Sequence, residues 1–290
     1  QAGVPDGKKE AVSFQDGASN QAFRIRPSVL RQMQKNGGIY RLPLTYTILT
    51  YAADPEQLSD NKPETVLRAS EQGGEEFYPF AFNLDYSPQM AERCAIDYVD
   101  AAQGTCNFEC DSFYAQLALL RRQKAALDTL PENLDVADIR NGLLYYYVIL
   151  SADSIVYQPG RYGYSELKQS VYYAYPSDYD GGCQLNFSSM LSINTQSEQK
   201  AGAWAFLSYL LSDACQQSVN YLPVSDAALQ EQFKQLLTEE TVTQANIDTF
   251  YTLVDHAQKL DYPTEPIEQI IEEEMAAYLD GAIDEKTTAE

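Results

Sequence analysis

Residues 143–150 are the feature that most constrains the fold of this chain. The run Leu-Leu-Tyr-Tyr-Tyr-Val-Ile-Leu holds eight apolar or aromatic residues in succession, with no polar residue at alternate positions. A strand with one face in water alternates, so an unbroken run is typical of a strand covered on both faces. Such strands occupy the centre of a sheet that carries helices on both sides. The sequence therefore predicts an α/β fold.

Short polar side chains follow this predicted strand at its carboxyl end. Ser151, Asp153 and Ser154 come directly after the apolar run. Open α/β sheets commonly bind ligands beyond the carboxyl ends of their strands. We therefore expect Ser151 and Asp153 to belong to a binding site. A second, tyrosine-rich strand is predicted at residues 171–175.

Helical periodicity appears on both sides of these strands. Phe113, Leu117 and Leu120 recur at helical spacing behind Asp111, a suitable N-cap residue. Further helices are predicted at 226–237 and 246–260, and a last one from Thr264 to Gly281 with Pro266 in its first turn. A helix near residues 28–35 precedes two strands at 39–43 and 45–51, and another helix is predicted at 135–142.

The segment 198–217 is the most apolar of the predicted helices. Ser197 is a plausible N-cap, and Trp204, Leu207 and Leu211 share one face. Because the apolar arc is broad, we expect this helix to be deeply buried. Trp204 is accordingly interpreted as a core residue.

The charge of the chain limits its partners. With 42 acidic and 20 basic residues, the formal net charge is −22, which repels phosphate backbones and anionic headgroups. We expect no nucleic-acid partner. No apolar run approaches the length of a membrane-spanning helix, so any membrane attachment is expected through a lipid anchor outside the sequence. Residues 1–22 are polar and lack periodicity, which predicts a flexible leader.

Cysteine and histidine offer little metal or catalytic chemistry here. Cys106 and Cys110 are close in sequence, but His256 is the one histidine and no second close cysteine pair completes a zinc site. A disulfide among Cys94, Cys106 and Cys110 is one alternative in an oxidising compartment, and ordinary buried thiols are the other. Nothing adjacent orients His256 as a catalytic base. We expect no metal, no cofactor and no enzymatic activity.

Four segments of the chain, taken in order, resemble a known family. They are residues 36–43, 98–113, 175–224 and 267–281. The third carries most of the resemblance, through Tyr175-Pro176, Ile193-Asn194, Ala203-Trp204 and the closing Leu222-Pro223-Val224. This order is similar to that of the extracellular solute-binding proteins of bacterial ABC importers, in their carbohydrate-binding group.

The resemblance implies a two-lobed fold of the periplasmic-binding-protein type II class, built from discontinuous segments. It places residues 23–52 and 176–235 in an N-terminal lobe and residues 53–175 and 236–290 in a C-terminal lobe, with chain crossings near residues 45 and 175. Members of the family carry roughly a hundred or more residues ahead of the equivalent of Asn36-Gly37-Gly38, so the N-terminal lobe is expected to be reduced.

The same resemblance implies the function. We expect a monomeric, lipid-anchored extracellular protein that binds a small solute, in the first place a carbohydrate, and delivers it to an ABC permease. The alternatives are an orphan relative that acts as a surface interaction module and, more weakly, a secreted enzyme acting on glycosides. Six ligand-binding candidates stand at predicted strand ends or crossings: Tyr46, Ser151, Asp153, Tyr157, Tyr175 and Asp178.

Overall fold

The computed structural model describes residues 25–35, 38–74, 78–81, 98–100, 103–129, 142–156, 171–176, 183–257 and 265–290. The predicted leader at residues 1–22 and almost all of the predicted helix at 135–142 lie outside these residues. The chain divides into two compact units. Unit 1 takes the described residues within 1–49, 148–156 and 183–259, and unit 2 those within 50–147, 157–182 and 260–290.

A mixed sheet forms the framework of the fold. Its strands follow the order β10-β3-β7-β4, and β8 and β9 also pair with β3. β4 runs parallel to β7, whereas β8, β9 and β10 are antiparallel to β3. The predicted α/β class is therefore confirmed. The strands are β3 (Thr45–Ala53), β4 (Tyr78–Ala81), β7 (Gly142–Ile149), β8 (Val171–Tyr173), β9 (Gln184–Ser188) and β10 (Leu222–Pro223).

The strand β7 has the burial that its sequence predicts. Only Tyr146 and Val148 are half-buried, and the other residues of the strand are buried on both faces of the sheet. β3 is likewise buried along almost its whole length. Because both strands lie inside the sheet, their side chains have no face in water, which explains the absence of alternation.

The chain passes between the two units inside these central strands. β3 belongs to unit 1 as far as Leu49, where it pairs with β9, and to unit 2 from Thr50, where it pairs with β8. β7 changes unit after Tyr147. The units and the predicted lobes differ at residues 50–52 and 176, which belong to unit 2, and at residues 148–156 and 236–257, which belong to unit 1.

Particular contacts explain this division. The backbone N–H of Leu222 donates to the carbonyl of Leu150 at 3.1 Å, which joins the end of β7 to β10 within unit 1. The ring of Phe233 on α8 (Asp226–Thr238) meets the ring of Phe250 on α9 (Gln244–Asp255) at 5.0 Å between centroids. Hydrophobic packing therefore keeps α9 with α8 in unit 1, whereas the lobes implied by the family resemblance divide the chain between them.

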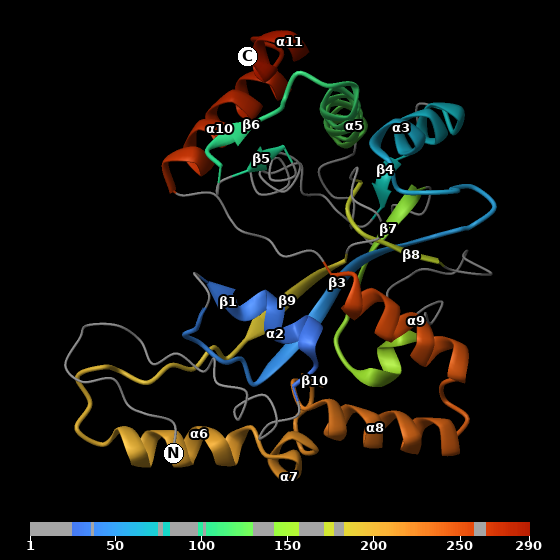
Figure 1. Cartoon of the computed structure of the whole chain (residues 1–290). Helices are drawn as coiled ribbons and strands as arrows, with labels where there is room; N and C mark the ends of the chain where they lie inside the picture. The colour runs from blue at the N-terminus through green and yellow to red at the C-terminus, as the bar shows by residue number, and fades with distance from the viewer. Residues whose placement is uncertain are drawn as a thin grey trace. The chain divides into compact units, whose positions relative to one another are not determined.

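Two helices pack on the strand β4 of unit 2, and a third packs against one of them. α3 (Pro63–Gln72) and α5 (Asp111–Asp128) lie side by side (Figure 1), and α10 (Glu265–Leu279) also contacts α5. The buried Gln123 of α5 accepts a hydrogen bond from the N–H of Phe80 at 3.1 Å and donates to its carbonyl at 2.8 Å. Its amide thereby occupies backbone groups of β4 that a further strand would otherwise bond.

Helix ends depart from the predictions by a residue or a turn. The N-cap of α5 is Cys110, and Asp111 is its first residue. α10 ends at Leu279, and Gly281 follows with φ of 75°, a left-handed conformation that costs glycine little. The remaining elements are α2 (Pro27–Met33), β1 (Gln34–Lys35), β2 (Gly38–Ile39), β5 (Val99–Asp100), β6 (Thr105–Cys106), η2 (Ala152–Ile155) and α11 (Glu285–Ala289). None of the helices in the described ranges has both the length and the apolar character that a membrane crossing needs.

The prediction of one deeply buried helix over 198–217 is wrong. The segment forms α6 (Lys200–Leu210) and a short α7 (Asp213–Gln216), because the Ser212 hydroxyl accepts the N–H of Cys215 and starts a new helix. Within α6 only Leu207 is buried. Phe206 is 61% exposed and Tyr209 64% exposed, and Trp204 is half-buried. An apolar arc in the sequence thus did not identify which residues the neighbouring elements cover.

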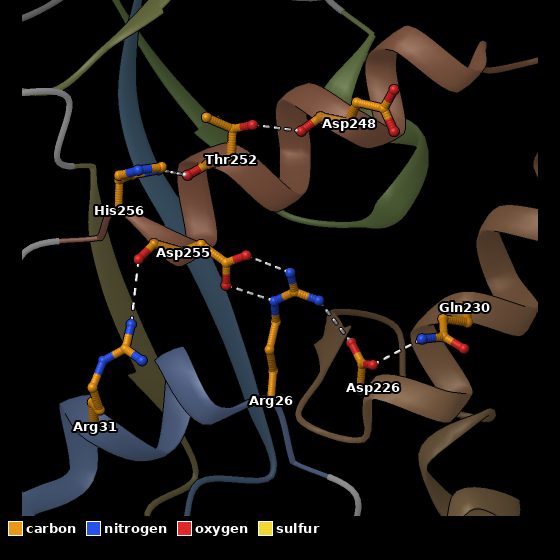
Figure 2. A network of polar contacts seen from close by, with 8 residues as sticks. All are labelled: Arg26, Arg31, Asp226, Gln230, Asp248, Thr252, Asp255 and His256. Carbon is orange, nitrogen blue, oxygen red and sulfur yellow. Dashed lines mark hydrogen bonds and ion pairs between the residues drawn. The ribbon is translucent and has the colours of Figure 1, made fainter.

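Arg26 joins the segment before α2 to two helices of unit 1. Its Nε and Nη2 atoms donate to the two carboxylate oxygens of Asp255 at 2.8 and 2.5 Å, and Nη1 lies 3.5 Å from Oδ1 of Asp226. Figure 2 shows the guanidinium between these two carboxylates. The guanidinium also lies over the ring of Tyr251, 4.1 Å from its centroid. One side chain thereby connects α2, α8 and α9.

This network predicts a pH-dependent contribution to stability. Hydrogen bonds from Arg26 lower the pKa of Asp255 below its ordinary value, against the opposing effect of partial burial. A carboxyl group with a lowered pKa in the folded state stabilises the fold above its unfolded pKa of about 4, and the contribution is lost as the pH falls through the folded pKa. Arg26, whose pKa is raised, stays charged over this range.

We therefore expect Asp255→Asn to lower the free energy of unfolding by about 1 kcal/mol at pH 7, a modest figure because the pair is partly exposed. Urea unfolding at several pH values measures the difference in the free energy of unfolding between the variant and the parent. This difference is expected to narrow below about pH 4. Asp248→Asn, an exposed change on the same helix, is the control. If the difference in the free energy of unfolding stays constant or widens in acid, the Arg26–Asp255 pair is not the source of the stability.

Candidate ligand-binding site

The candidate site begins where β7 ends. The chain turns after Leu150 into the short helix η2, and the Ser151 hydroxyl donates to Oδ1 of Asp153 at 2.5 Å. The Ser151 and Ser154 hydroxyl oxygens are 2.7 Å apart. These contacts hold the Ser151 and Asp153 side chains together at the carboxyl end of the strand, as the sequence predicts for a site of an α/β sheet.

A second segment of unit 1 completes the site. The pairing of Leu222 with Tyr46 of β3 and its bond to Leu150 bring residues 219–221 beside η2. α8 contacts both η2 and β10 and forms the remaining wall. The three segments border an open hollow of about 190 Å³, lined by Ser151, Ala152, Asp153, Val219, Asn220, Tyr221, Gln232, Gln235 and Leu236.

The lining of this hollow suits a small polar ligand without negative charge. Asp153 contributes a carboxylate, Asn220 and Gln232 contribute amides, and no Lys, Arg or His is among the lining residues. Tyr221 is 50% exposed and offers an aromatic face. Carboxylates and amides bond hydroxyl groups, and aromatic rings pack on the apolar surfaces between them. The volume is below the roughly 300–1,000 Å³ of pockets for drug-sized ligands.

The six residues predicted as ligand-binding candidates do not share one place. Ser151 and Asp153 line the hollow. Tyr46 is 1% exposed inside unit 1, its ring 6.3 Å from that of Phe187, and burial raises the pKa of its hydroxyl well above the ordinary value. Tyr175 is 8% exposed in the core of unit 2, stacked on Phe80 at 5.4 Å. Tyr157 and Asp178 lie outside the described residues.

Tyr46 and Tyr175 are thus core residues in this structure, for a common reason. Each occupies a position where a buried strand or its end packs against other aromatic rings, and a tyrosine in a strand fills a core as readily as it contacts a ligand. The position near a strand end did not distinguish these two environments.

Sequence reasoning missed most of the other lining residues. Asn220 and Tyr221 stand just ahead of Leu222-Pro223-Val224, and Gln232 lies on a helix that the sequence does predict. A half-exposed tyrosine before a strand is a weak indication of a site. Their neighbours Ser151 and Asp153 lie about seventy positions earlier in the chain, and contacts between distant segments bring them together: the pairing of β10 with β3, the Leu222–Leu150 hydrogen bond and the packing of α8 on η2.

The cysteines of the described part of the chain form no disulfide with one another. Cys106, Cys110, Cys183 and Cys215 are free thiols, and Cys106 is exposed, unlike the buried thiol predicted for it. Burial raises the pKa of Cys183 to about 12, and its Sγ donates to the carbonyl of Leu253 at 3.0 Å. Within the described ranges, no three His, Cys, Asp or Glu side chains gather as metal ligands would.

The fold is shared with solved binding proteins, although no family model and no curated protein matches the sequence. An extracellular solute-binding protein family 1 from Alicyclobacillus acidocaldarius aligns over 97% of this chain and 77% of its own, with 15% identity and a TM-score of 0.58. An ABC transporter solute-binding protein from Thermotoga lettingae, bound with α-D-tagatose, aligns over 96% and 77% with 11% identity and a TM-score of 0.60.

A third solved structure extends the comparison to a polyol. An ABC transporter solute-binding protein from Agrobacterium radiobacter, in complex with ribitol, aligns over 97% of this chain and 78% of its own, with 14% identity and a TM-score of 0.58. These matches agree with the mixed sheet and its flanking helices described above. The chain therefore has the periplasmic-binding-protein-like α/β fold of the extracellular solute-binding proteins of ABC transporters.

Proposed function

We propose that this protein captures a small sugar or polyol outside the cell for uptake by an ABC permease. The observation that carries the proposal is the match of nearly the whole chain to binding proteins, among them those solved with α-D-tagatose and with ribitol. The hollow in unit 1 supports it, since Asp153, Asn220 and Tyr221 supply the hydrogen-bonding and aromatic groups that a polyhydroxylated ligand needs.

The proposed role is to bind a ligand and not to convert it. Capture proteins act by shifting the population of their conformations towards the one that the ligand stabilises, and a partner then recognises that conformation. The proposal accordingly assigns the chain no catalytic step. It also places the protein outside the cell as a monomer on a lipid anchor, with the permease as its partner.

The test combines ligand screening with one matched pair of variants. We expect a monosaccharide or polyol to raise the unfolding temperature of the parent protein, because a ligand that binds the folded state alone stabilises it. Asp153→Asn is expected to weaken that ligand about tenfold in calorimetry, the effect of one charge-assisted hydrogen bond. Asp248→Asn, an exposed change on α9, leaves affinity unchanged.

Two results would contradict this proposal in different ways. If a folded protein responds to no sugar or polyol, solute capture is wrong. If a sugar binds equally well to the parent and to Asp153→Asn, with both folded by circular dichroism, the function stands and the site lies elsewhere.

The alternative function is that of a surface interaction module that no longer captures solute. The exposed apolar side chains of α6, Phe206 and Tyr209, favour it, because grouped apolar residues on a surface often mark protein contacts. The absence of any ligand response in the screen above would favour this alternative.

A further inference from the structure

A second hollow lies in unit 2, apart from the one that contains Asp153. It has a volume of about 310 Å³ and lies between the turn that follows β3 and one side of α3. Its lining is mostly polar and consists of Pro55, Glu56, Gln57, Ser59, Thr65, Arg68, Ala69 and Gln72. The volume reaches the lower end of the roughly 300–1,000 Å³ that small-molecule pockets occupy.

The turn that forms the first wall is held in one conformation by its own hydrogen bonds. The carbonyl of Asp54 accepts the N–H groups of Gln57 and Leu58 at 3.0 and 3.1 Å, and its carboxylate accepts the N–H of Glu56 at 2.9 Å. Leu58 is buried in the core, and its carbonyl accepts the Tyr173 hydroxyl at 3.0 Å. The turn therefore presents Glu56 and Gln57 from a fixed backbone.

The helix that forms the second wall is anchored from its opposite side. Val66 and Ser70 of α3 are fully buried. Thr65, Arg68 and Gln72 recur at spacings of three and four, so they form one stripe along the helix towards the turn. Both walls are thus fixed by core contacts, which lowers the entropic cost of binding a ligand between them.

The hollow contains one positive and one negative side chain that do not neutralise each other. Arg68 and Glu56 both line it, and no ion pair within 4.0 Å joins them. In the described structure Arg68 has one hydrogen bond, to Oγ1 of Thr65 at the outer limit of 3.5 Å. The guanidinium therefore keeps most of its donors for a ligand, and a guanidinium can bond both oxygens of a carboxylate.

The charges decide the class of ligand. A simple anion would meet Glu56 and a chain of net charge −22, and a simple cation would meet Arg68. A molecule that carries both charges satisfies both side chains, and the amides of Gln57 and Gln72 with the Ser59 hydroxyl can bond its remaining polar groups.

We propose that this hollow binds a small zwitterion, a free α-amino acid, with its carboxylate on Arg68 and its ammonium group on Glu56. The proposal is independent of sugar capture, since the two hollows share no residue. It gives the chain a small-molecule site in unit 2, in addition to the hollow in unit 1.

Calorimetric titration of the full chain with four probes tests this site. Glycine and glutamine carry both charges, whereas acetate and methylammonium each carry one. Both amino acids are expected to bind about tenfold more tightly than either single-charge probe, and Arg68→Gln and Glu56→Gln are each expected to weaken glutamine about tenfold. Arg41→Gln and Glu64→Gln, exposed residues outside the hollow, match these charge changes and are expected to leave binding unaltered.

Three outcomes would overturn the proposal. One is acetate binding as tightly as glycine, which would make the hollow an anion site. Another is glutamine binding that Arg68→Gln or Glu56→Gln does not change. The third is the absence of amino-acid binding to the folded parent. Because both side chains are exposed, the variants are expected to fold, which the unfolding temperature checks.

Discussion

Replacing Gln216 by Leu is expected to lower the free energy of unfolding by about 4 kcal/mol, the largest effect of any polar substitution that we predict. Gln216 is fully buried at the end of α7. Its Nε2 donates to the carbonyls of Leu44 and Leu210 at 3.2 and 3.1 Å, and its Oε1 accepts the N–H groups of Val224 and Ser225 at 2.9 and 3.2 Å.

The physical reason is that leucine preserves the volume of the side chain and leaves two buried N–H groups and two partly buried carbonyls without this partner. Each unsatisfied group costs roughly 1–3 kcal/mol, and partial relaxation keeps the sum below the full total. Chemical denaturation measures the loss. Gln217→Leu, at the next and exposed position, is expected to change stability by less than about 0.5 kcal/mol. Equal losses in the two variants would mean that the buried amide does not join these segments.

Phe250→Ala is expected to destabilise unit 1 by about 4 kcal/mol, within the usual range for removal of a buried phenylalanine. Phe250 is fully buried on α9, and its ring meets those of Phe233 and Tyr251 at 5.0 and 5.5 Å in T-shaped contacts. Truncation removes these contacts and leaves a cavity between α8 and α9. Thermal and urea unfolding of the variant measure the effect.

The neighbouring tyrosine supplies the control for this substitution. The Tyr251 hydroxyl is buried and has no hydrogen-bond partner in the described structure. Tyr251→Phe keeps the ring contacts and removes an unsatisfied polar atom, so it is expected to leave stability equal or slightly higher. A loss approaching that of Phe250→Ala would show that the hydroxyl, not ring packing, stabilises this part of unit 1.

Local sequence patterns predicted individual elements well where they depended on local physics. The unbroken apolar run of β7 indicated a strand buried on both faces, and the helix predicted at 226–237 matches α8, whose start is capped by the Ser225 side chain. The same patterns were misleading for α6. Hydrophobic periodicity records which side chains favour burial, but Phe206 and Tyr209 are buried only if another element packs over them.

For a similar reason, the sequence predicted only part of the lining of the candidate site. Ser151 and Asp153 follow a recognisable strand, so their position at the carboxyl end of β7 could be inferred. Tyr46 and Tyr175 have comparable local contexts and prove to be core residues. The remaining lining of the hollow, from Val219 to Leu236, reaches η2 through strand pairing and helix packing that no local pattern encodes.

By itself, the sequence determined the fold class, the central strands and the expectation of a binding protein, because these follow from hydrophobic patterning and the order of motifs. Only the tertiary structure decided which polar side chains share a hollow and which aromatic rings become core. It also decided which charged side chains form ion pairs. Arg26 pairs with Asp226 and Asp255, whereas Arg68 and Glu56 form no ion pair with each other. The reason is that burial and pairing depend on contacts between distant segments, whereas propensity acts on near neighbours.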